Sequence, residues 1–125
     1  MSRPRLGIAV LLALAWASAG LADVPPGEAY VLHCSGCHGP DGSGQPGFIP
    51  SLRDLDALLS RPGGRAYLGR VPGVAQAPVD DARLAALLNW VLEEIANTTD
   101  FDPYRTEEVG ILRSEPLRAP LEARP

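Results

Sequence analysis

The cysteines and histidines of this chain are concentrated in the stretch Tyr30 to Gly39, which reads YVLHCSGCHG. Cys34 and Cys37 are its only cysteines, and His33 and His38 are its only histidines. At 125 residues the chain has room for one small domain, which is little for a self-sufficient hydrophobic core. A disulfide, a metal or a cofactor held by this cluster would therefore add stability that the apolar side chains alone do not supply.

Residues 1–22 have the pattern of a secretory signal peptide. Two arginines near the N-terminus precede an apolar run over residues 6–17, and small-residue cleavage sequences end at Ala19 and Ala22. The apolar run is shorter than the ~20 residues needed to cross a bilayer, which favours cleavage over a retained anchor. We therefore expect a periplasmic protein whose mature chain starts near Asp23 and does not insert into the membrane.

The mature chain is expected to be acidic. Beyond residue 22 it has nine arginines, no lysine and fifteen acidic residues, so its formal charge is 9 − 15 = −6. Such a chain is a poor candidate for binding nucleic acid or anionic lipid. A protein partner with a basic docking face would be favoured, because complementary charge steers the encounter.

The apolar pattern beyond residue 22 predicts helices and no strands. Glu28 to His33 is predicted to form a short helix that carries the cluster. Asp80 to Ala96 is the most regular predicted helix, behind a capping Asp80. Its apolar residues recur at spacings of three and four: Leu84, Leu87, Leu88, Val91, Leu92 and Ile95.

The segments between these helices are rich in glycine and proline. Gly39 to Pro50 has four glycines and three prolines, which predicts a loop. Ser51, followed three residues later by an acid, predicts the N-cap of a helix over residues 51–60. We expect a helical turn over Gly64 to Arg70 and an extended or looped segment over Val71 to Pro78.

Residues 98–125 are predicted to form a C-terminal extension. The sequence turns polar there, and Thr106 with the two acids after it can start one short helix. The end, from Glu115 to Pro125, is predicted to be a surface tail.

Four interpretations compete for the C-x-x-C-H sequence of Cys34, Cys37 and His38. A closed zinc site wants four ligands, and no second pair exists in the mature chain. A dithiol redox motif would be expected in a thioredoxin-like alternation of strands and helices, and a disulfide would close only a tiny loop. Covalent haem attachment is favoured, because the two thiols can each add to a vinyl group while the imidazole reaches the iron.

From about Gly27 to Ala96 the sequence resembles the small monohaem class I c-type cytochromes. The similarity is carried by YVLHCSGCHG, by the loop PDGSG, by the segment Pro50-Ser51-Leu52 and by the helix LAALLNWVLEEI. It implies an all-α, cytochrome c-like fold of three to five short helices around one covalently attached haem, formed by residues 23–97. It also implies that the first and last helices cross, with Tyr30 and Trp90 meeting there.

The same resemblance implies the site residues. Cys34 and Cys37 would hold haem c covalently, and His38 would be the axial iron ligand. The carbonyl of Pro50 would accept a hydrogen bond from the other ring nitrogen of His38, which fixes the tautomer and aims Nε2 at the iron. Leu52 would pack on the haem.

The sequence departs from the family at the sixth ligand. Ala77 stands where most members have methionine, and Met1 is removed with the signal peptide. His33 directly precedes Cys34 on the His38 side of the ring, so we expect it to be a surface or helix-packing residue. Gln76 offers a weak amide ligand, and an open or water-occupied site is the remaining option.

Two functions from different classes remain open. The resemblance implies a periplasmic electron-transfer protein, not an enzyme, which shuttles single electrons between redox partner proteins such as a dehydrogenase, an oxidase or another cytochrome. An open sixth position would instead suit a haem-based binder of small ligands or a peroxidase-like enzyme.

Overall fold

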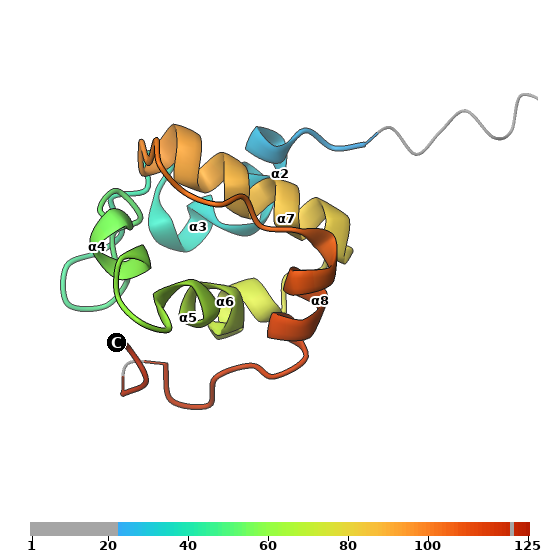
Figure 1. The fold of residues 1–125 in the computed structure, drawn as a ribbon. Helices are drawn as coiled ribbons and strands as arrows, with labels where there is room; N and C mark the ends of the chain where they lie inside the picture. Colours follow the sequence, from blue (N-terminus) through green and yellow to red (C-terminus); the bar gives the residue numbers. More distant parts are fainter. Residues whose placement is uncertain (1–22, 121) are drawn as a thin grey trace, which may run out of the picture.

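Helices make up the regular structure of the protein, seen in a computed structural model that describes residues 23–120 and 122–125 (Figure 1). The predicted signal peptide, residues 1–22, lies outside the described residues. Within them, the only β feature is an isolated antiparallel bridge between Gln45 and Ile49. The prediction of an all-α fold is therefore confirmed for this part of the chain. None of its helices is long and apolar enough to cross a membrane.

The described residues form seven α-helical segments and one π-helical turn, more than the three to five helices predicted. Three of the segments are single turns, because glycines and prolines interrupt the helical stretches between the two longer crossing helices. The segments are α2 (Pro26–His33), α3 (Ser35–His38), α4 (Asp56–Leu59), α5 (Gly64–Arg70), α6 (Pro72–Ala75), α7 (Asp81–Trp90), η1 (Val91–Ile95) and α8 (Thr106–Arg113).

The longest helix, α7, begins and continues as the sequence predicts. The carboxylate of Asp80 caps it by accepting a hydrogen bond of 2.8 Å from the backbone N–H of Arg83. The π-helical turn η1 continues the helix, and Asn97 then ends it with a left-handed φ of 54°. The predicted helix over residues 80–96 is therefore confirmed.

The crossing of α2 with α7 is also confirmed. The rings of Tyr30 and Trp90 meet there with centroids 5.4 Å apart and planes tilted by 42°. Gly27 permits the close approach, because a Cβ at this position would lie 3.2 Å from the Trp90 ring. The α2 helix starts two residues earlier than expected, with Pro26 in its first turn.

Two predictions about the middle of the chain are wrong. Ser51 does not cap a helix: its hydroxyl accepts a hydrogen bond of 3.1 Å from the N–H of Arg53, which makes a local turn, and α4 starts only at Asp56. The expected loop over 71–78 contains the helical turn α6, which Pro72 starts. The helix over Gly64–Arg70 is confirmed as α5.

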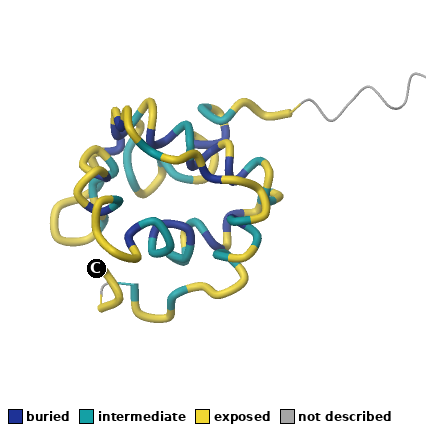
Figure 2. The backbone as a smooth tube through the Cα atoms, in the orientation of Figure 1, coloured by how far each residue is buried: buried dark blue, intermediate teal, exposed yellow. Residues whose placement is uncertain are grey.

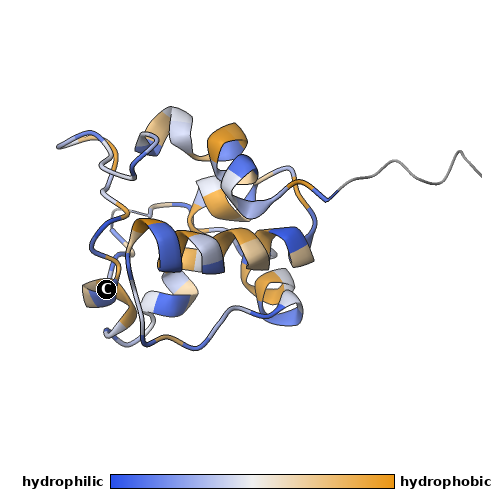
Figure 3. Ribbon diagram, turned by 90° about the horizontal axis from the view of Figure 1, so that it is seen from above, coloured by the Kyte–Doolittle hydropathy of each residue, from blue (hydrophilic) through white to orange (hydrophobic). Residues whose placement is uncertain are grey.

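One apolar core joins the N-terminal and C-terminal parts of the chain. Figure 2 shows the buried segments in dark blue on the inner sides of the helices. In Figure 3, which is coloured by hydropathy, the long helix α7 carries both orange apolar and blue polar residues. The most deeply buried large side chains are Tyr30, Leu84, Leu92 and Val109. Val109 belongs to the C-terminal extension, so the extension contributes to the core.

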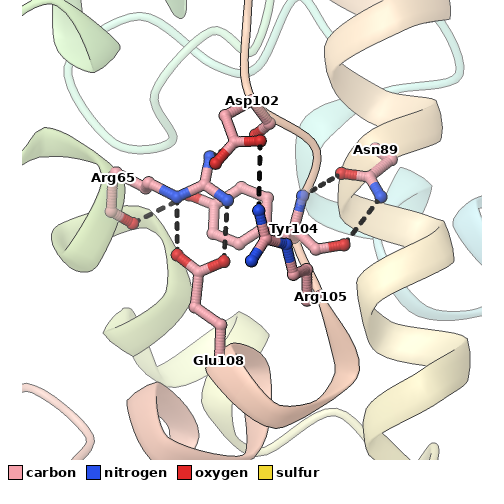
Figure 4. Close-up of polar contacts among 6 residues, drawn as sticks. All are labelled: Arg65, Asn89, Asp102, Tyr104, Arg105 and Glu108. Atoms are coloured by element: carbon pink, nitrogen blue, oxygen red, sulfur yellow. Dashed lines mark hydrogen bonds and ion pairs between the residues drawn. The ribbon is translucent and has the colours of Figure 1, made fainter.

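The extension is anchored to α5 and α7 before α8 begins (Figure 4). Tyr104 is buried, and its backbone N–H and C=O both bond to the side-chain amide of Asn89 on α7. Its hydroxyl donates to the carbonyl of Arg65, whose guanidinium lies 4.0 Å from the Tyr104 ring centroid. Arg65 also forms a bidentate ion pair with Glu108 of α8.

The tail after α8 runs back along the surface and is tied to earlier residues. The N–H of Leu117 donates to the carbonyl of Arg70 over 2.8 Å, and the Tyr67 hydroxyl donates to the carbonyl of Pro120 over 3.0 Å. The short helix predicted from Thr106 is confirmed as α8. The tail is largely exposed, as expected, but it is also hydrogen-bonded to α5.

Candidate functional site

The Cys/His cluster lies at the junction of α2 and α3. The backbone N–H groups of Cys37 and His38 both bond to the carbonyl of Cys34, at 3.2 and 3.0 Å, so that one helical turn carries all three side chains. Both cysteines are free thiols, Cys34 half-buried and Cys37 exposed. Two thiols and one imidazole are thus presented from a single turn.

The two thiols have different surroundings. Cys34 packs against the core, and this burial raises the pKa of its thiol, with the neighbouring Cys37 adding to the effect. Since the thiolate is the nucleophilic form, the burial of Cys34 lowers the reactivity of its thiol in the folded chain.

The imidazole of His38 is oriented by a backbone carbonyl. Its Nδ1 lies 3.0 Å from the carbonyl oxygen of Pro50, the contact that the family resemblance implies. A carbonyl oxygen only accepts hydrogen bonds, so Nδ1 must carry the proton. In the neutral ring Nε2 then keeps its lone pair, which is the form that binds a metal.

The loop from Gly39 to Pro50 places this carbonyl by folding back on itself. The N–H of Gly44 donates to the carbonyl of His38 over 2.8 Å, and the N–H of Leu52 donates to the carbonyl of Gly42 over 2.8 Å. Gly44 has a φ of 68°, and a Cβ on it would lie 2.6 Å from the Pro50 oxygen. Only glycine therefore fits beside the acceptor of His38.

Two further contacts secure the loop. The hydroxyl of Tyr30 donates to the carbonyl of Gly39 over 2.6 Å, just after the cluster ends. Burial raises the pKa of this hydroxyl, and the acidic neighbours Cys34 and Asp41 add to the shift. Asp41 in turn forms an ion pair with Arg53, beyond the loop.

The sequence-predicted site residues are therefore only partly in mutual contact. His38 and Pro50 are joined by a hydrogen bond. Leu52 is half-buried and packs against the core together with Cys34, whereas Cys37 faces solvent. Their assignment as haem-binding residues remains a prediction.

The three residues considered for a sixth ligand differ in their exposure to solvent. Ala77 is 7% exposed and part of the core, and its methyl group cannot bind a metal. Gln76 is exposed. His33 is exposed and lines a surface cleft of about 490 Å³ between α2 and the start of α7, with Leu32 and Arg83 among its other walls. The position of His33 agrees with the expected surface or helix-packing role.

Sequence reasoning missed Arg113, at the end of α8. Its side chain is 18% exposed and bonds to the segment around Ala77. The only sequence signal is an arginine in the last turn of a short helix, which is typical of any helix C-terminus. That pattern does not indicate a distant partner.

The donor set fits a haem c. It consists of two unpaired thiols three residues apart and an imidazole whose Nε2 is free to bind iron, all on one helical turn. In the part of the chain that the structure describes, no three or more His, Cys, Asp or Glu side chains gather as a metal site. The cluster thus has no additional ligands there for the closed zinc alternative.

Comparison of the chain with models of protein families gives no match, and comparison with curated proteins gives none either. The described residues define an all-α protein with two cysteines and a histidine on one helical turn.

Proposed function

We propose that this protein is a periplasmic electron carrier that holds one haem c through thioethers to Cys34 and Cys37, with His38 as an axial ligand. The single observation that carries this proposal is the hydrogen bond between His38 Nδ1 and the Pro50 carbonyl. In the neutral imidazole this contact leaves the Nε2 lone pair available beside two free thiols. When bound, the haem supplies an iron that gains and loses one electron.

The protein's own residues would hold and shield this group. Each thiol would add across one vinyl group, so that a carbon–sulfur bond forms and the thiol proton passes to the neighbouring carbon. The Pro50 carbonyl keeps the His38 ring from turning, and Leu52 offers a half-buried apolar surface next to the loop. The acidic balance of the chain favours redox partner proteins with a basic docking face.

Haem attachment is tested by the mass of the protein exported in a host with haem-attachment machinery. We expect one added haem in the wild-type protein and loss of stable attachment when both Cys34 and Cys37 are replaced by alanine. Ser35→Ala is the matched control on the same turn, because the Ser35 hydroxyl bonds only to the carbonyl of Val31 among the described residues. An unmodified mass, or a disulfide between the two cysteines, would end the proposal.

The alanine at position 77 favours a second candidate, a haem-based binder of small ligands. With no thioether on this segment, an exogenous ligand would not have to displace an internal one. Reduced-minus-oxidised and carbon monoxide difference spectra separate the two functions. Tight carbon monoxide binding favours the ligand binder, and a spectrum unaffected by carbon monoxide favours the carrier.

A further inference from the structure

The guanidinium of Arg113 binds the segment that runs from the last residue of α6 to the first residue of α7 at four points. This segment, residues 75–81, contains Ala77, and the arginine reaches it from α8, more than thirty residues further along the chain. Nε donates to Ala75 O over 3.1 Å, Nη2 to Ala77 O over 2.6 Å, and Nη1 to Val79 O over 2.7 Å and to Asp81 Oδ1 over 3.0 Å.

These bonds satisfy backbone groups that lie outside any long helix. Ala75 and Ala77 are each 7% exposed, so carbonyls there need a partner within the protein. The planar guanidinium offers five N–H donors in a fixed arrangement, which a single lysine ammonium cannot reproduce. Arg113 therefore fixes the carbonyls of three alternate residues of the segment at once, Ala75, Ala77 and Val79.

The helix that carries Arg113 is anchored without it. Val109 is 1% exposed in the core, and Glu108 pairs with Arg65 on α5. Leu112 packs onto Gly69, where a Cβ would lie 2.6 Å from the leucine Cδ1. Loss of the Arg113 side chain should thus free the 75–81 segment while α8 stays in place.

We propose that Arg113 is a positioning residue that holds the 75–81 segment in one conformation and so would restrict access of small ligands to the haem iron. The second part rests on the proposed haem c function, in which Ala77 stands at the position where the family resemblance implies a methionine ligand. A methionine at position 77 could bind the iron and so hold this segment. Ala77 provides no such bond, and the segment is held by the hydrogen bonds of Arg113.

Hydrogen exchange of the full-length chain tests the first part. The N–H groups of Ala77 and Val79 are both hydrogen-bonded, so their exchange reports local opening. In Arg113→Gln we expect their exchange to accelerate at least ~10-fold, while amides in α2 and α7 keep their rates. Arg105→Gln is the matched control: Arg105 is exposed, and among residues 23–120 and 122–125 its ion pair is with Asp102, at 3.8 Å.

Unchanged exchange at Ala77 and Val79 in a folded Arg113→Gln protein overturns the proposal. If that variant does not fold, Arg113→Lys replaces it, because lysine keeps the charge and most of the stem but not the fork. We then expect accelerated exchange of the same two amides, and unchanged exchange again overturns the proposal.

Imidazole binding to the haem-loaded protein tests the second part. In Arg113→Gln we expect association at least ~5-fold faster than in the wild type, with Arg105→Gln unchanged, because a loosened segment opens more often. Accelerated exchange with unchanged imidazole association overturns the gating role. If no haem attaches to the wild type, the proposed function and the gating role both fail, whereas the exchange experiment still decides whether Arg113 holds the segment.

Discussion

The Nδ1 atom of His38 lies 3.0 Å from the carbonyl oxygen of Pro50, twelve residues further along the chain. Replacing the side chain of Pro50 does not remove its backbone carbonyl. To test this hydrogen bond, the carbonyl must instead be displaced by a substitution at a residue that lies beside it. Gly44 is that residue, because a Cβ added to it would lie 2.6 Å from the Pro50 oxygen.

We expect Gly44→Ala to destabilise the protein and release His38. Both Gly44 and Gly47 have positive φ, 68° and 82°, so alanine at either costs ~1 kcal/mol of backbone strain. Only at Gly44 would the new Cβ crowd Pro50, at 2.6 Å from its oxygen, whereas nothing lies within 4 Å at Gly47. Urea unfolding should show an additional loss of ~1–2 kcal/mol for Gly44→Ala over Gly47→Ala. Equal losses would contradict this account of the loop.

Trp90→Ala tests the crossing of α2 and α7. Trp90 is half-buried, so its truncation should cost somewhat less than a fully buried tryptophan, ~2–3 kcal/mol in the free energy of unfolding. Phe48→Ala is the matched aromatic control: Phe48 is 83% exposed and its loss should cost less than ~0.5 kcal/mol. If Trp90→Ala lowers the free energy of unfolding no more than Phe48→Ala does, the contact of Trp90 with α2 does not stabilise the fold.

The ion pair of Glu108 with Arg65 predicts a pH-dependent stability. The hydrogen bonds from Arg65 lower the pKa of the Glu108 carboxyl in the folded state. A depressed pKa stabilises the fold above the unfolded value of ~4.3, and this contribution is lost as the pH falls through the folded pKa. Glu108→Gln should therefore be ~1 kcal/mol less stable than wild type at pH 7, and the two should converge in acid.

Glu107→Gln is the control for this titration, because Glu107 is exposed and has no ion pair within the described residues. Its stability should follow the wild type across the same pH range. A Glu108→Gln difference that persists unchanged at pH 3 would mean that packing, rather than charge, explains the loss.

The two thiols should label at different rates in the reduced, haem-free chain. Burial raises the pKa of Cys34, while Cys37 is exposed, so iodoacetamide should modify Cys37 at least ~3-fold faster at pH 7.5. Peptide mass spectrometry of a quenched time course measures both rates. In 8 M urea the difference should disappear, and equal rates in the folded chain would contradict the burial of Cys34.

Ala77→Met in the haem-loaded protein tests the missing ligand. A thioether at this position should convert the ferric spectrum to low-spin and raise the reduction potential, because thioether ligation favours ferrous iron. Ala75→Met is the matched control, since Ala75 is equally buried on the same segment. A wild-type protein that is already fully low-spin, and in which Ala77→Met changes nothing, would show that another ligand is bound.

The local features of the site could be predicted from the sequence. Cys34, Cys37 and His38 are adjacent in the chain, so one helical turn suffices to present them together. The cap at Asp80 and the helix after it depend on residues within a few positions of each other. Periodicity and spacing report such short-range structure well.

Ser51 shows where this reasoning stops, because the same residue suits both a helix cap and a turn. The N–H of Leu52 donates a hydrogen bond to the carbonyl of Gly42, and this bond stabilises the turn rather than the helix. That partner lies ten residues away, in a loop whose path depends on Gly44 and on the Tyr30 hydroxyl. Groups far away in the sequence thus determine whether Ser51 forms a helix cap or a turn, and local secondary-structure propensity does not describe such groups.

The sequence alone determined the helical turn that carries Cys34, Cys37 and His38, the two crossing helices and the absence of methionine at position 77. Only the tertiary structure decided that the C-terminal extension packs into the core and that Arg113 binds the segment around Ala77. The physical reason is the range of the interactions. A helical turn and its cap form between residues three or four apart, whereas an arginine can find its carbonyl partners only after the core has brought α8 against α7.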